Sequence, residues 1–263
     1  MNRAKKRHQK NLARKALKKK RGHPPQPPKQ TGSGVPVDKL LELAQKGLQL
    51  HQAGQLQEAE TVYRQILDIK PDFAEAHNNL GTVLQELGRL DEAVASYHKA
   101  LAINPDYAEA HYNLGIAFQE LGRLEESVAS YQKALAIKPD YAKAHSNFGN
   151  ALHDLGKLDE AVASYHKALA IKPDYADAHY NLGLALSELG KLEEAVASYR
   201  KALAIKPDFA EALNNLGETH LQAGQHKEGL QCLQKASGMI HFSNREQTRH
   251  FTILGGTLGV GNL

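Results

Sequence analysis

The stretch Ala100-Leu101-Ala102-Ile103-Asn104-Pro105-Asp106 decides the fold, because close copies of it return along most of the chain. Its proline recurs every 34 residues, at Pro71, Pro105, Pro139, Pro173 and Pro207. A fixed period of this length is the sequence signature of a repeat architecture. Aligned on that period, the repeats are 40–73, 74–107, 108–141, 142–175, 176–209 and 210–243, and the first and last diverge most.

Each repeat has the pattern of two short helices. In repeat 74–107, apolar residues recur at helical spacing as far as Gly88, a residue that readily takes the left-handed conformation at a helix end. A second helix then opens with acidic Asp91, which suits the positive end of the helix dipole, and stops before Pro105. Helices this short must stack on their neighbours to bury a core.

The helix starts carry a weaker signal. Asp72 stands three residues before Glu75, which predicts a capping box at the start of the first helix of repeat 74–107.

These residues resemble the tetratricopeptide repeat pattern across 40–243. The matching positions in the second repeat are His77, Leu80, Gly81, Leu84, Gly88, Ala93, Tyr97, Ala100 and Pro105. The resemblance implies an all-α, right-handed superhelical solenoid of about six 34-residue helix-turn-helix repeats, whose first helices line a concave groove. The position that is usually Trp in the family is filled by His77, His111, His145, His179 and, in the last repeat, Leu213.

Composition and charge limit the function classes. Cys232 is the only cysteine, which excludes an intrachain disulfide and a thiolate zinc site and fits a reducing compartment. No apolar run reaches the roughly eighteen residues of a membrane span, so no transmembrane segment is predicted and we expect a cytoplasmic location. Residues 1–31 hold twelve of the 33 Lys and Arg and none of the 29 acidic residues, which leaves residues 32–263 at about −8.

One stripe of the first helices is the candidate binding surface. On a helical wheel, repeat positions 4, 7, 8 and 11 of this helix are buried, and positions 2, 6, 9 and 13 lie opposite. Position 6 carries Asn79, Asn113, Asn147, Asn181 and Asn215. Asparagine is a poor helix former at an exposed position, whereas its amide pairs well with the backbone of an extended peptide. Copying of repeats is the competing explanation, since residues 90–103 and 158–171 are identical.

The asparagine row resembles the asparagine ladder of protein O-linked N-acetylglucosamine transferases, whose repeats hold a substrate backbone. This implies a groove for an extended protein or peptide partner, with Tyr112 and Tyr180 adding stacking contacts. Acidic residues flank the row and favour basic ligand segments: Glu86, Glu120, Asp154 and Glu188 at position 13, and Glu75, Glu109 and Asp177 at position 2.

Two other series are assigned to packing. His77, His111, His145 and His179 recur roughly 10 Å apart if helices pack normally, too far for shared metal ligands, so no metal site is predicted. Tyr63, Tyr97, Tyr131, Tyr165 and Tyr199 are predicted in the core. No phosphate-binding loop, nucleophile elbow or Cys–His arrangement is present, so neither catalysis nor a cofactor is expected.

The two ends suggest alternatives. Residues 1–37 read as a disordered basic arm and Pro/Gly-containing linker, and residues 1–31 would attract nucleic acid or an anionic surface weakly and without base specificity. Residues 244–263 are a Gly-rich tail that serves as an irregular cap, an oligomer contact or the start of a further domain.

The primary hypothesis for the function is a non-enzymatic interaction scaffold, and the main alternative is the substrate-recognition portion or an accessory of a glycosyltransferase.

Overall fold

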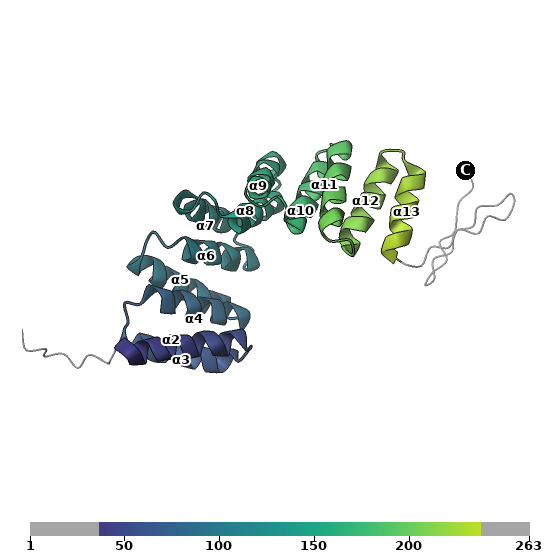
Figure 1. Cartoon of the computed structure of the whole chain (residues 1–263). Helices are drawn as coiled ribbons and strands as arrows, with labels where there is room; N and C mark the ends of the chain where they lie inside the picture. The colour runs from purple at the N-terminus through teal and green to yellow at the C-terminus, as the bar shows by residue number, and fades with distance from the viewer. Residues whose placement is uncertain (1–36, 238–263) are drawn as a thin grey trace, which may run out of the picture. The chain divides into compact units, whose positions relative to one another are not determined.

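The computed structural model describes residues 37–237, which form twelve α-helices and no strand (Figure 1). The prediction of an all-α solenoid of about six repeats is therefore confirmed. The predicted basic arm, apart from residue 37, and the predicted tail at 244–263 lie outside the described residues, as do residues 238–243 of the last repeat.

The helices alternate between the two kinds predicted, called here A (first) and B (second). The A helices are α2 (Val37–Gln52), α4 (Ala74–Glu86), α6 (Ala108–Glu120), α8 (Ala142–Asp154), α10 (Ala176–Glu188) and α12 (Ala210–Gln222). The B helices are α3 (Leu56–Ile69), α5 (Leu90–Ile103), α7 (Leu124–Ile137), α9 (Leu158–Ile171), α11 (Leu192–Ile205) and α13 (His226–Ser237).

Glycine ends the A helices and the segment before proline ends the B helices, as the sequence indicates. Gly88 has a φ of +74°, and the N–H of Arg89 donates to the carbonyl of Leu84 at 2.9 Å, which closes the end of α4. The B helix α5 ends at Ile103, two residues before Pro105.

The capping box predicted at Asp72 is wrong. The cap residue of α4 is Phe73, and no side chain caps the first turn. The turn is held instead by His77, whose Nε2 donates to the carbonyl of Pro71 at 2.9 Å. A side-chain bond to the backbone six residues earlier thus takes the place of the predicted cap.

A row of tyrosines forms the centre of the core, as predicted. Tyr63, Tyr97, Tyr131, Tyr165 and Tyr199 are each at most 1% exposed. Each packs against a glycine of the A helix in the same repeat. A Cβ on Gly81 would lie only 2.6 Å from Cε1 of Tyr97, so the ring takes the space that a side chain would need.

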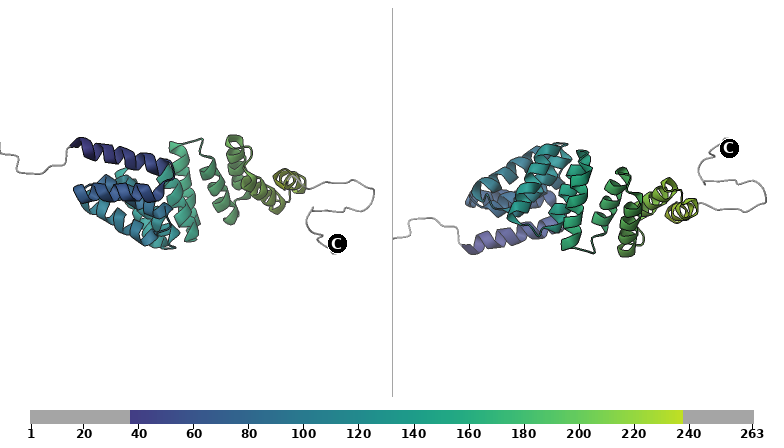
Figure 2. Two further views of the ribbon diagram at one scale, coloured as in Figure 1. Left: turned by 90° about the horizontal axis from the view of Figure 1, so that it is seen from below. Right: turned by 90° about the horizontal axis from the view of Figure 1, so that it is seen from above.

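Consecutive helices pack on each other in chain order from α3 to α13. The unbroken colour gradient along the helices shows the same order in the further views of Figure 2. Across repeats, each of α4, α6, α8 and α10 also contacts the next A helix. The B helices within residues 37–237 make no contact of that extent with each other, so the A helices form the side where neighbouring repeats approach most closely.

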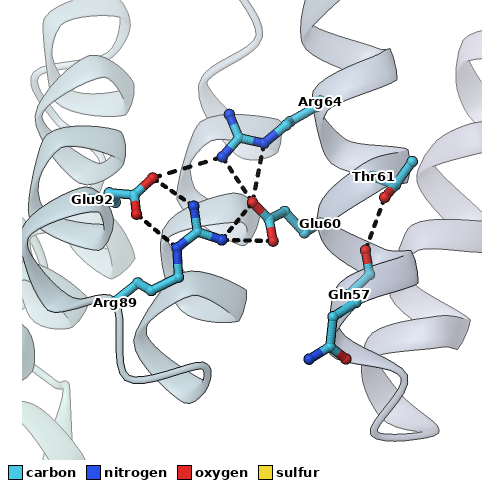
Figure 3. Close-up of polar contacts among 6 residues, drawn as sticks. All are labelled: Gln57, Glu60, Thr61, Arg64, Arg89 and Glu92. Atoms are coloured by element: carbon cyan, nitrogen blue, oxygen red, sulfur yellow. Dashed lines mark hydrogen bonds and ion pairs between the residues drawn. The ribbon is translucent and has the colours of Figure 1, made fainter.

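An ion-pair network joins the first two repeats on the B-helix side (Figure 3). Glu60 of α3 accepts hydrogen bonds from Arg64 at 2.8 Å and from Arg89 at 2.8 Å, and Arg89 also donates to Glu92 at 2.6 Å. Burial alone would raise the pKa of Glu60, but the bonds from the two guanidinium groups outweigh it and the pKa is lowered. The network ties α3 to the start of α5.

Candidate peptide-binding face

The A-helix face is the side of the A helices that carries repeat positions 2, 6, 9 and 13. Positions 2 and 13 are exposed in the second to fifth repeats, as the helical wheel predicts. Positions 6 and 9 are only half-exposed there, because neighbouring A helices approach each other on this side. The expectation that position 6 is exposed is therefore corrected.

The predicted asparagines all lie half-buried on this face. Four of them bond to the preceding repeat through the amide nitrogen: Asn113 donates to Oδ1 of Asn78 at 3.0 Å, Asn147 to the hydroxyl of Tyr112 at 3.1 Å, Asn181 to Oδ1 of Asn150 at 2.9 Å, and Asn215 to the hydroxyl of Tyr180 at 3.0 Å. Asn79 occupies the same position on α4. The row therefore couples neighbouring repeats, a role that the sequence reasoning missed.

These inter-repeat bonds leave other hydrogen-bonding groups of the asparagine side chains unused. A carboxamide offers two N–H donors and an acceptor oxygen, and each bond uses one donor. The row therefore retains hydrogen-bonding capacity, at a depth where water only partly competes.

The two predicted tyrosines sit in matching aromatic clusters on the same face. The ring of Tyr112 lies 4.9 Å from that of Tyr141, and the ring of Tyr180 lies 4.8 Å from that of Phe209, measured between centroids. Burial, with smaller effects from Tyr141 and Tyr175, raises the pKa of Tyr112 to about 12. Both hydroxyls therefore stay neutral at physiological pH and accept the asparagine bonds described above.

The acidic residues at position 13 form a second row of bonds between repeats. Each carboxylate accepts a hydrogen bond from position 12 of the preceding repeat: Glu86 from His51 at 2.9 Å, Glu120 from Gln85 at 2.8 Å, Asp154 from Gln119 at 2.8 Å, and Glu188 from His153 at 2.9 Å. The side chains of Glu86, Asp154 and Glu188 stay 44–52% exposed. Their charge therefore remains available to a ligand.

A pocket opens on this face between α8 and α10. Its volume is about 330 Å³, and most of the residues that line it are polar: Gln119, Asn150, His153, Asp154, Tyr165, Asn181 and Leu184. The sequence reasoning named Asp154 and Asn181 but gave no special role to Asn150, which accepts bonds from both Asn181 and the hydroxyl of Tyr165.

A sequence signal for these contacts exists. Most of the bonds between A helices join residues 35 positions apart, one more than the repeat length. Complementary donor and acceptor types that recur at this separation would have predicted both rows.

The histidine series lies on the opposite side of the A helices and serves packing, as predicted. His77, His111, His145 and His179 are 7–8% exposed, and each Nε2 donates to the carbonyl of the proline six residues earlier at 2.9–3.0 Å. Burial lowers the pKa of His111, His145 and His179, which keeps these rings neutral. Within residues 37–237, no group of three or more His, Cys, Asp or Glu is placed to hold a metal ion.

No helix within the described part of the chain is long and apolar enough to cross a membrane.

Comparison with protein families agrees with the repeat period. The family model for the TPR repeat matches residues 47–88, 83–122, 118–156, 149–190 and 185–224, and the model for the tetratricopeptide repeat matches residues 210–239. Comparison with curated proteins finds no match.

Solved structures share the fold. MamA is 27% identical, with 60% of this chain and 92% of MamA covered and a TM-score of 0.58. YrrB, described as a TPR protein with an unusual peptide-binding site, is 23% identical, with coverage of 67% and 91% and a TM-score of 0.59. PilF from Pseudomonas aeruginosa is 21% identical, with coverage of 75% and 91% and a TM-score of 0.68. At these identities, YrrB and PilF show only that the fold is shared.

Proposed function

Because the chain belongs to the tetratricopeptide repeat family, we propose that it is a non-enzymatic interaction scaffold that binds an extended peptide or protein segment along its A-helix face. The observation that carries this proposal is the row of half-buried asparagines, present in five consecutive repeats with donor and acceptor groups left over. An extended peptide offers one N–H and one carbonyl at every residue other than proline, so a row of amides suits it whatever its side chains.

The charge of the face supports a basic ligand segment. The carboxylates of Glu86, Asp154 and Glu188 are held in place by bonds from the preceding repeat, yet remain about half exposed. A fixed carboxylate loses little side-chain freedom when a lysine or arginine binds it. The net charge of about −8 on residues 32–263 adds long-range attraction for such a segment.

The test uses the full-length chain and peptides selected against it from a random display library. Affinities of the selected peptides are measured by fluorescence anisotropy for the wild type and for a variant with Asn113→Ala, Asn147→Ala and Asn181→Ala. Three hydrogen bonds to a ligand backbone contribute roughly 0.5–1.5 kcal/mol each, so the variant is expected to bind at least about tenfold more weakly.

A matched triple variant on the B helices serves as the control. Gln132→Ala, His166→Ala and Arg200→Ala alter exposed positions on the opposite side of the repeats and should leave affinity unchanged. Circular dichroism checks that both variants keep their helicity, because the asparagines also join the repeats. Equal affinities of wild type and asparagine variant, with both folded, would refute the proposed face.

A further inference from the structure

The A-helix face alternates in chemistry with a period of two repeats. At position 9, the first, third and fifth repeats carry Leu48, Ile116 and Leu184, whereas the second and fourth carry Thr82 and Asn150. Leu48 is 48% exposed, and the other four are half-buried on the same face. An apolar side chain therefore faces the ligand side in every second repeat.

The hydrogen bonds between repeats alternate in the same way. Asn113 and Asn181, in the third and fifth repeats, donate to side-chain amide oxygens, that of Asn78 at position 5 and that of Asn150 at position 9. In the fourth and sixth repeats, the position 6 asparagines donate instead to the hydroxyls of Tyr112 and Tyr180. The alternation thus extends from the surface residue to the groups that support it.

Two equivalent apolar subsites result. Ile116 lies one helical turn from Tyr112, which packs against Tyr141. Leu184 lies one turn from Tyr180, and both belong to the partly buried shell around the core of the fifth repeat. Each subsite thus combines an aliphatic side chain with an aromatic ring whose hydroxyl already has a partner.

The pocket of about 330 Å³ between α8 and α10 adjoins the second of these subsites, because Leu184 is one of its lining residues. Asn150 and Asp154 of α8 line it, and Asp154 is fixed by the bond from Gln119. A polar pocket with a half-exposed carboxylate at its edge suits the ammonium or guanidinium group of a basic side chain. The fourth repeat thus has polar Asn150 at position 9 and a pocket edged by a carboxylate, whereas the third and fifth repeats have apolar residues at position 9.

The spacing of these subsites fits one peptide conformation. Packed helices lie about 8–10 Å apart, so adjacent repeats place equivalent subsites roughly 10 Å apart. A polyproline II helix rises about 3.1 Å per residue with three residues per turn, so every third side chain points the same way at intervals of about 9.3 Å. Its backbone groups make no internal hydrogen bonds, which leaves them free for the asparagine row.

From this arrangement we propose that the A-helix face selects a peptide in polyproline II conformation, with an apolar side chain at one position, Lys or Arg three residues later, and a second apolar side chain after three more. The inference rests on the proposed peptide-binding function and adds the pattern of the ligand. Duplication of a two-repeat unit would explain why the pattern recurs, but it predicts no preference for such a peptide.

The probe is a fluorescein-labelled peptide of sequence Leu-Pro-Ser-Lys-Pro-Ser-Leu, and the control is Leu-Pro-Lys-Ser-Pro-Leu-Ser, which has the same composition in the wrong register. Fluorescence anisotropy with the full-length chain should show about tenfold tighter binding of the probe. Equal binding of both peptides would overturn the pattern while leaving the peptide-binding function intact. Binding of neither peptide would overturn the pattern, and failure of the display selection would separately overturn the function.

Three single substitutions test which residues of the A-helix face give the preference for the probe peptide. Ile116→Thr and Leu184→Thr place at position 9 the residue that the second repeat has naturally at Thr82. Each should reduce the preference for the probe about fivefold. Asp154→Asn should remove the advantage of a peptide with lysine at the middle position over one with glutamine there. Unchanged selectivity in all three folded variants would refute the assignment.

Discussion

Replacing Gly149 by alanine is expected to lower the free energy of unfolding by about 2 kcal/mol, although alanine is the better helix former by about 1 kcal/mol. A Cβ at this position would lie 2.6, 2.8 and 2.9 Å from three ring carbons of Tyr165, which is 1% exposed. Forcing extra volume into a packed core costs about 1–3 kcal/mol. Moving the ring also strains the 2.8 Å bond from Tyr165 to Asn150, a loss of about 1 kcal/mol.

Urea unfolding followed by far-ultraviolet circular dichroism measures the effect, and Gly47→Ala is the matched control. That change brings the same gain in helix propensity, but its Cβ would meet the nearest carbon of Tyr63 at 3.0 Å, a milder contact. We expect the midpoint to fall by about 1 M for Gly149→Ala and by much less for Gly47→Ala. A Gly149→Ala chain as stable as the wild type, or equal shifts in both variants, would refute the packing argument.

Three further predictions concern the groups that join or fill the repeats. Folding lowers the pKa values of His111, His145 and His179, so the unfolded chain takes up protons first as the pH falls. The melting temperature should therefore be steady above about pH 6.5 and drop below it. A flat profile of melting temperature between pH 7.5 and 5.5 would contradict this. Arg89→Met should lower the melting temperature more than Arg123→Met, because Arg89 binds the carboxylates of both Glu60 and Glu92. Arg123 binds one carboxylate, that of Glu126, and its guanidinium lies over the ring of Phe118, an apolar contact that methionine can also make. The difference should shrink in high salt. Tyr165→Phe should lower the free energy of unfolding in urea by about 1 kcal/mol. Tyr131→Phe should lower it less, because the Tyr131 hydroxyl makes a weaker 3.3 Å bond to Gln119. Equal losses in the two variants would argue against the hydrogen bonds as the cause.

Sequence reasoning predicted the local structure of the repeats well. The 34-residue period, the helix ends at Gly88 and before Pro105, and the tyrosine core all follow from helix geometry and residue preferences. It failed at the start of α4, where a contact from His77 to the backbone replaces the predicted Asp72 cap. The local preference of Asp72 was outweighed by a packed side chain, which the sequence pattern alone does not reveal.

The sequence by itself therefore determined the fold class, the 34-residue period and the side of each A helix on which the candidate ligand-binding residues lie, because helical periodicity fixes direction within one helix. Only the tertiary structure decided how deeply Asn113 and Asn147 are buried and which partners they bind. Those features depend on how closely one repeat packs on the next, and that distance is set by side chains from two helices at once.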